Sequence, residues 1–187
     1  RFTLNALAEV SYDNKNSLIF LAESGDEVRL DGAVQVSNRF EVQNAEVNTS
    51  VTDAQIQALQ VVFNNNDSVG ALDNRILLNT ERVQLLNTQG NVYLQEVNSL
   101  VISGISNPMG VVDIIANGSI SDSAVLASSQ AIQLQSNNGD ITLDNANNLT
   151  GALTLVSSGR VTLNNNASTD LAGLSAQNAD IVINGNL

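Results

Sequence analysis

The sequence predicts an all-β fold, a right-handed parallel β-helix (β-solenoid) with three strands per coil and about 20–22 residues per coil. Three observations lead to this prediction. Short apolar triplets alternate inward and outward residues, asparagine-rich turns separate the triplets, and the triplets recur at a nearly constant interval. Each observation is weak alone, and together they predict stacked coils.

The strands are predicted from triplets in which two apolar residues flank one outward residue. Val92-Tyr93-Leu94, Ile141-Thr142-Leu143 and Val161-Thr162-Leu163 are typical. This period of two is the signature of a strand that buries one face. The triplets are too short for the long hairpins of a β-sandwich.

The turns are predicted from asparagine, which fills 27 positions and often clusters, as at 64–66 and 164–166. Asparagine tolerates left-handed backbone and bonds neighbouring main chain. We therefore expect these clusters at corners, stacked over equivalent polar residues of adjacent coils. The pairs Asn138-Gly139 and Asn184-Gly185 predict turns with positive φ at or beside the glycine.

The spacing of the triplets predicts three rows of inward residues. One row takes Val92, Val112, Ile132, Leu153 and Leu174, and a second takes Leu100, Ile120, Ile141, Val161 and Ile181. A looser third row takes Val83, Ile105, Leu126, Leu149 and Leu171. Three rows indicate a three-sided coil that cannot bury its apolar face alone. The blade of a β-propeller needs about twice this period, and a leucine-rich repeat needs a helical side.

Residues 1–187 are predicted to form a single β-solenoid segment that is irregular, or carries a short insertion, near residues 48–73. Within it, Val51–Leu59 has apolar residues at i, i+3, i+5 and i+8. This pattern fits a short helix capped by Thr52 or Asp53, or a bulged corner or loop insertion. Residues 64–73 then form a turn or loop.

The last third of the chain carries phrases that alternate. They are Asn138–Leu143 (NGDITL), Leu149–Leu155 (LTGALTL) and Ser158–Leu163 (SGRVTL). This alternation resembles the repeats of filamentous-haemagglutinin-type bacterial exoproteins, well over residues 130–187, loosely over 83–129, and by general pattern over 1–82. The resemblance implies a right-handed β-helix in a large secreted adhesin of the two-partner secretion family, and hence a secreted or bacterial cell-surface location.

Composition narrows the classes of partner. There are 7 basic and 19 acidic residues, which gives a net charge of −12. Nucleic acid and anionic lipid need clustered Lys and Arg, so neither is expected as a partner. The apolar runs are only a few residues long, so membrane insertion is not expected either. With 3% aromatic residues and no Trp, the core must be aliphatic.

No catalytic site is predicted. The chain has no His and no Cys, which excludes Ser-His-Asp triads, Cys-His dyads and metal-thiolate sites within it. A glycosidase needs two carboxylates in one site, for which Asp113, Asp122, Asp140 and Asp144 are the candidates. Asp140 follows Gly139, where an Asp commonly caps a turn. Neither the glycine-rich calcium nonapeptide nor an EF-hand loop is present. We expect a non-enzyme without cofactor or metal.

Three functions remain open. The chain is a structural shaft of a secreted adhesin, involved in cell adhesion or biofilm, or a binding module with a flat strand face, or a polysaccharide-degrading β-helix such as a phage tailspike. The expected partners are a host or bacterial surface protein or glycan and the remainder of a larger repeat protein. One candidate interaction ladder takes the outward residues Val101, Ser121, Thr142, Thr162 and Val182, all small or β-branched and uncharged. The preference of such residues for exposed strands explains the same pattern.

Overall fold

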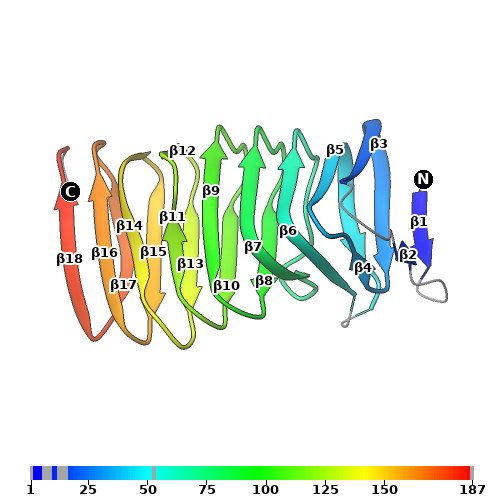
Figure 1. Cartoon of the computed structure of the whole chain (residues 1–187). Helices are drawn as coiled ribbons and strands as arrows, with labels where there is room; N and C mark the ends of the chain where they lie inside the picture. Colours follow the sequence, from blue (N-terminus) through cyan, green and yellow to red (C-terminus); the bar gives the residue numbers. More distant parts are fainter. Residues whose placement is uncertain (1, 6–9, 12–16, 52–53, 186–187) are drawn as a thin grey trace.

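The computed structural model describes residues 2–5, 10–11, 17–51 and 54–185. It is an all-β parallel β-solenoid of about 8 turns with about 20 residues per turn, and its described residues contain no helix. Figure 1 shows the coils stacked side by side into a rod, with the two ends of the chain at opposite ends of the stack. The predicted fold class is confirmed.

The described residues form one sheet of 18 strands that winds through the stack. The first nine strands are β1 (Phe2–Asn5), β2 (Val10–Ser11), β3 (Leu18–Asp31), β4 (Val34–Gln35), β5 (Arg39–Thr49), β6 (Gln55–Asn64), β7 (Ile76–Leu86), β8 (Val92–Glu96) and β9 (Leu100–Ser106). The others are β10 (Val112–Ala116), β11 (Ile120–Asp122), β12 (Leu126–Ser128), β13 (Ile132–Ser136), β14 (Ile141–Leu149), β15 (Ala152–Ser157), β16 (Arg160–Asn165), β17 (Asp170–Ser175) and β18 (Asn178–Ile183).

The register of the parallel pairs confirms most of the first two predicted rows. Val92 pairs with Val112, Val112 with Ile132, and Ile132 with Leu153. The second row is in register from Leu100 through Ile120 and Ile141 to Val161. Like residues therefore stack on like residues along the rod, which buries the aliphatic face of each coil against its neighbours.

The last member of each of these two rows was predicted wrongly. The observed pairs are Leu155 with Leu174 and Leu163 with Ile181, one inward position further along the strand. The final coil is shorter than the others, because Arg160 pairs with Asn178, which lies 18 residues later (178 minus 160). A constant period of 20 or 21 residues overshoots such a coil.

The third predicted row is only partly correct. Leu126 pairs with Ile105 as expected. Val83 instead pairs with Ile102, Ser128 with Leu149, and Leu171 lies on β17, which belongs to the first row. The third side is irregular because β9 and β14 run on around a corner that β11 and β12 divide into two strands. A bulge in β14 then shifts the register.

The irregular region near residues 48–73 contains a strand and a turn rather than a helix. Residues 55–64 form β6, so the helix considered for Val51–Leu59 is wrong over its described part; Thr52 and Asp53 lie outside the described residues. Beyond β6, the main chains of Ala71 and Asn74 exchange two hydrogen bonds of 3.0 Å, which close a tight turn. The expected turn or loop thus lies between β6 and β7.

The core is a stack of aliphatic side chains, as the composition predicted, with Phe40 and Phe63 as its large aromatic members. Triplets follow the predicted alternation: Ile141 and Leu143 are fully buried, whereas Thr142 between them is half-buried. No helix in the described part of the chain is long and apolar enough to cross a membrane.

Asparagine occupies the corners as predicted. Asn44, Asn65, Asn87 and Asn107 all have positive φ, at 61°, 54°, 51° and 48°, and they form one column through successive coils. Neighbouring side chains in the column bond to each other, with Nδ2 of Asn65 donating to Oδ1 of Asn44 at 2.8 Å. This column satisfies side-chain amides without water.

The glycines of two predicted turns serve a different purpose. Neither Gly139 nor Gly185 has positive φ, nor do their described neighbours, so that prediction was wrong. A Cβ added at Gly139 would lie 2.3 Å from Oγ of Ser119 and 2.8 Å from its main-chain nitrogen. Glycine is needed there because the neighbouring coil approaches so closely.

Candidate functional site

The predicted ladder lies on the outer side of β9, β11, β14 and β16. Four of its five residues are in register in successive coils, in the order Val101, Ser121, Thr142 and Thr162. The fifth is misplaced: Asp180 stands beside Thr162, and Val182 pairs with Asn164. The short final coil shifts β18 by two residues, which moves a charge into the ladder.

Charged residues close the ladder at both ends. Arg82 pairs with Val101 at one end, and Asp180 stands at the other. Asp180 also forms an ion pair with Arg160 of the preceding coil. The uncharged stretch is therefore four residues long, and its side chains are half-buried between their neighbours. It is shorter than the sequence predicted.

A second outer face, formed by β8, β10, β13 and β15, is more shaped. Its outward side chains make two rows through these four coils. One row is Tyr93, Asp113, Gln133 and Thr154, and the other is Gln95, Ile115, Gln135 and Val156. The aspartate is the only ionisable acid or base in these rows apart from the tyrosine, so the face is nearly neutral on a protein of net charge −12.

Arg75, just before β7, reaches across this face. Its Nη1 and Nη2 donate to Oδ1 and Oδ2 of Asp113 at 3.0 and 2.7 Å, and its guanidinium lies 5.6 Å from the centre of the Tyr93 ring. It also donates to the main-chain oxygen of Asp113 at 3.0 Å. The two charged side chains are only 12% and 11% exposed, which makes this two-point ion pair stronger than an ordinary surface pair.

The sequence did not reveal this arginine. Arg75 and Asp113 are separated by 38 positions and lie two coils apart. Asp113 was a candidate carboxylate for glycoside hydrolysis, and the structure places it in this ion pair instead. The signal that could have found the pair is a spacing of nearly two repeat lengths between opposite charges.

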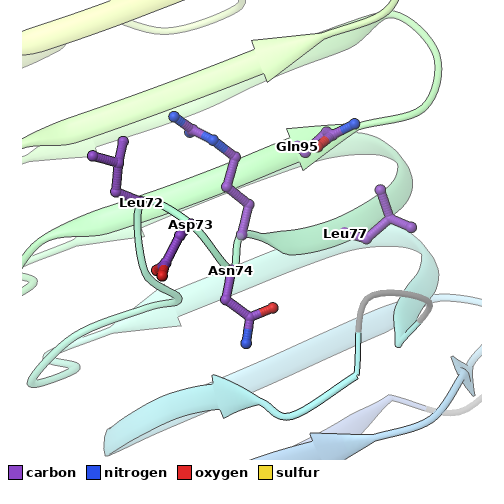
Figure 2. A pocket seen from close by; sticks show the side chains of 6 residues that line it. Leu72, Asp73, Asn74, Leu77 and Gln95 are labelled. Atoms are coloured by element: carbon purple, nitrogen blue, oxygen red, sulfur yellow. The ribbon is translucent and has the colours of Figure 1, made fainter.

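Two hollows lie on either side of Arg75. One, of about 190 Å³, is bordered by the side chains of Gln133, Gln135 and Thr154 and by Ile115 and Val156. The other, of about 340 Å³, lies between the 71–74 turn and the start of β8. Figure 2 shows the second hollow, with the turn residues on one side and Leu77 and Gln95 on the other. Amide, hydroxyl and aliphatic groups line them, a mixture suited to a neutral polar ligand.

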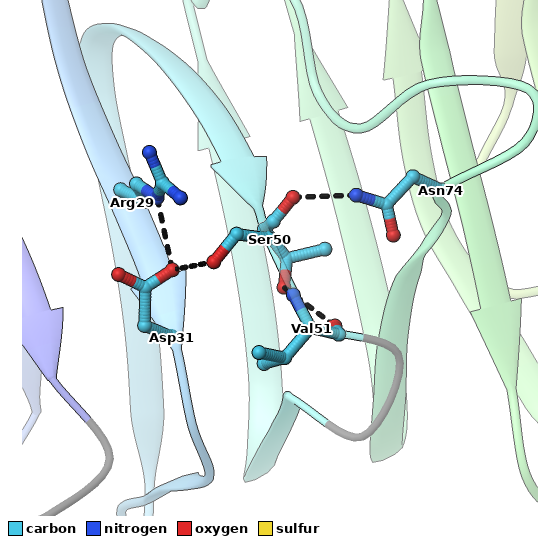
Figure 3. Close-up of polar contacts among 6 residues, drawn as sticks. Arg29, Asp31, Ser50, Val51 and Asn74 are labelled. Atoms are coloured by element: carbon cyan, nitrogen blue, oxygen red, sulfur yellow. Dashed lines mark hydrogen bonds and ion pairs between the residues drawn. The ribbon is translucent and has the colours of Figure 1, made fainter.

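The 71–74 turn is fixed to the preceding coils. The side-chain amide of Asn74 donates to the main-chain oxygen of Thr49. One coil further back, Oδ1 of Asp31 accepts from the hydroxyl of Ser50 and, at 2.9 Å, from Nε of Arg29 (Figure 3). The hydrogen bond from Ser50, followed by that from Arg29, lowers the pKa of Asp31.

The remaining candidate carboxylates bond to neighbouring coils. Oδ1 of Asp140 accepts from the main-chain nitrogen of Arg160 at 2.7 Å, which agrees with the predicted capping role. Asp122 is nearly buried, and it accepts from the main chain of Asp144 at 3.2 Å and from Nδ2 of Asn147 at 2.8 Å. Within the described ranges, no group of three or more Asp or Glu residues is placed to hold a metal ion.

Glu96 is a buried carboxylate that the sequence reasoning missed. It is 0% exposed, and its two oxygens accept from the main-chain nitrogens of Thr80 and Asn98, each at 3.0 Å. Burial raises the pKa of Glu96 to about 7, and these hydrogen bonds offset part of that rise. The signal was its position at the end of β8, where the next coils carry Ala116 and Ser136.

Comparison with known proteins adds one finding. Residues 89–156, which include β8 to β15 apart from the last residue of β15, are similar to a family described as repeats of unknown function (DUF5649). No curated protein and no solved structure matches the chain. The chain is thus a β-solenoid repeat protein, and the family description adds no activity.

Proposed function

We propose that this β-solenoid is a structural shaft segment of a secreted bacterial surface adhesin, serving cell adhesion or biofilm. The observation that carries the proposal is the use of polar side chains between coils. Asn98 bonds to Asn79 at 3.2 Å, Asn137 to Asn117 at 3.2 Å, and Asp140 to the main chain of the next coil. Side chains that could act on a ligand are instead committed to holding the coils in register.

The geometry suits a spacer. Each coil of a parallel solenoid adds about 4.8 Å, so about eight coils give a rod on the order of 40 Å long. Continuous main-chain pairing makes such a rod stiff without disulfides, and the chain has no Cys. A stiff rod can hold a binding tip away from a cell surface.

The resemblance of residues 130–187 to filamentous-haemagglutinin-type repeats supports secretion, with a location outside the cell or on its surface. The high negative charge keeps such a protein soluble. The partners that we propose are the remainder of a larger repeat protein and, through it, a host or bacterial surface protein or glycan. We propose no catalytic role, because the candidate carboxylates bond between coils.

Deleting one whole coil tests the shaft. Removal of residues 132–152 places Leu153 where Ile132 stood and leaves the Arg75–Asp113 pair intact. Because the chain has no Cys, spin labels can be attached at Ser24→Cys and Ser175→Cys, both exposed, and their separation measured by pulsed electron resonance. A shaft shortens by about 4.8 Å and stays folded.

The complementary assay is binding of the isolated chain to bacterial and host cells and to glycan arrays. A shaft does not bind by itself, before or after the deletion. Binding by the intact chain that disappears with the deleted coil would contradict the shaft and favour a binding module.

The second candidate function is a binding module that uses the face beside Arg75. The two hollows favour this face over the predicted ladder, and their neutral lining favours a glycan or a neutral protein surface. Two matched variants separate the faces: Gln133→Lys with Thr154→Lys, and Thr142→Lys with Thr162→Lys. Each pair lies in adjacent coils and points outward. If the module exists here, only the first pair abolishes binding of the folded protein.

A further inference from the structure

Asn66 and Thr88 occupy the same corner of two successive coils. The main-chain nitrogen of Gln89 donates to the oxygen of Asn66 at 2.7 Å, and that of Met109 donates to the oxygen of Thr88 at 2.8 Å. The two residues thus make the same main-chain bond to the next coil. Both side chains are 0% exposed. Whatever satisfies their polar atoms must therefore lie inside the corner.

The hydrogen bonds of this corner leave two atoms unpaired. Nδ2 of Asn66 donates to the main-chain oxygen of Ala45 at 2.8 Å. Among the described residues, Oδ1 of Asn66 and Oγ1 of Thr88 have no partner. Buried polar atoms are almost always hydrogen-bonded, because an unpaired one has lost its water without compensation. The amide oxygen needs a donor, and the hydroxyl needs a donor or an acceptor.

We propose that Asn66 and Thr88 hold one internal water molecule, which bridges Oδ1 of Asn66 to Oγ1 of Thr88. Neighbouring coils lie about 4.8 Å apart, which is too far for a direct bond between equivalent positions but suits one molecule bonded at about 2.8 Å to each. Water can donate to the amide oxygen and also accept from, or donate to, the hydroxyl. Buried waters typically make about three such bonds, and main-chain oxygens of the corner supply the third.

The position of this water has a reason in the coil lengths. The positive-φ asparagines at this corner are separated by 21, 22 and 20 residues, from Asn44 to Asn65, Asn87 and Asn107. The water lies at the longest step, between the coils of Asn65 and Asn87. At the next step Pro108 occupies the corner, and it has no N–H to donate. The water replaces one polar contact where the coil changes length, and it does so whether or not the rod serves as a shaft.

A crystal structure of the protein at atomic resolution, together with water-to-protein NOE spectra, tests the site. The wild type should show one ordered water within hydrogen-bonding distance of both oxygens, with a long-lived cross-peak to the Thr88 methyl group. Thr88→Val should lose this water and its cross-peak. The control is Thr169→Val, because Thr169 is also buried but its hydroxyl already donates to Gly151 at 3.1 Å. The control should retain the water.

Three results would overturn the proposal. The first is a direct bond between the two side chains with no water, and the second is a dry corner with both atoms unpaired. The third is density with coordination distances of a metal ion instead of water. Should Thr88→Val fail to fold, the wild-type structure and spectra still decide.

Discussion

Replacing Glu96 with Gln should remove a pH dependence from the stability of the rod. Glu96 is 0% exposed at the end of β8, and its carboxylate accepts from two main-chain nitrogens. Gln keeps the shape and one acceptor oxygen but does not ionise. The variant therefore isolates the contribution of the buried charge.

The size and sign follow from the pKa. Burial raises the pKa of Glu96 from 4.5 to about 7 in the folded protein, while the unfolded chain keeps the ordinary value. Between these values the folded state binds a proton that the unfolded state has released, so the free energy of unfolding falls as pH rises. The extra stability is fully present below pH 4.5 and is lost above about 7. At about 1.4 kcal/mol per pH unit, the loss is at most about 3 kcal/mol.

Urea unfolding followed by circular dichroism from pH 5 to 8 measures this effect. The difference between wild type and Glu96→Gln should shift against the wild type by about 2–3 kcal/mol over that range and level off above pH 7. Glu81→Gln, at an exposed position, controls for the loss of one negative charge. A difference that stays constant, or that shifts toward the wild type with rising pH, would refute the reasoning.

Three further substitutions or measurements test the packing. Ile141→Asp buries an unpaired charge and should cost about 4 kcal/mol in urea unfolding, whereas Thr142→Asp should cost less than about 1 kcal/mol; equal losses would contradict the inward and outward assignment. Gly139→Ala should cost about 1–3 kcal/mol in the same assay because the added carbon meets the adjacent coil, and a neutral result would show that the coils can separate there. The amide of Asn166 donates to the oxygen of Asn147 at 2.7 Å, so its hydrogen exchange should be slow, and rapid exchange would indicate a loose loop.

The fold was predictable because a solenoid repeats one local rule. Each coil must bury its aliphatic residues on its neighbours, so the period of Val92, Val112 and Ile132 is visible in the sequence and reappears as register in the structure. The rule fails where a coil changes length. The final coil has lost residues, and the sequence has no marker that distinguishes Leu163 from Val161 as the partner of Ile181.

The candidate site was less predictable because its contacts cross coils. The ladder through Thr142 and Thr162 followed from the period, and only its last residue was displaced. The interaction of Arg75 with Asp113 depends on an arginine that projects from an irregular turn, and the spacing of the triplets does not describe such turns. The burial of Glu96 depends on the shape of a corner. Neither shape can be read from hydrophobic alternation.

The reach of Arg75 also affects how the rod would come apart. In a linear array whose units touch only their neighbours, opening from an end proceeds one unit at a time, each step losing a single interface. Arg75 joins its own coil to one two places away and crosses the coil between them. Opening that arrives from the C-terminal side must therefore break an interface and this second-neighbour bond in the same step. The bond makes residues 75–113 a cooperative block, at which fraying from that end would pause.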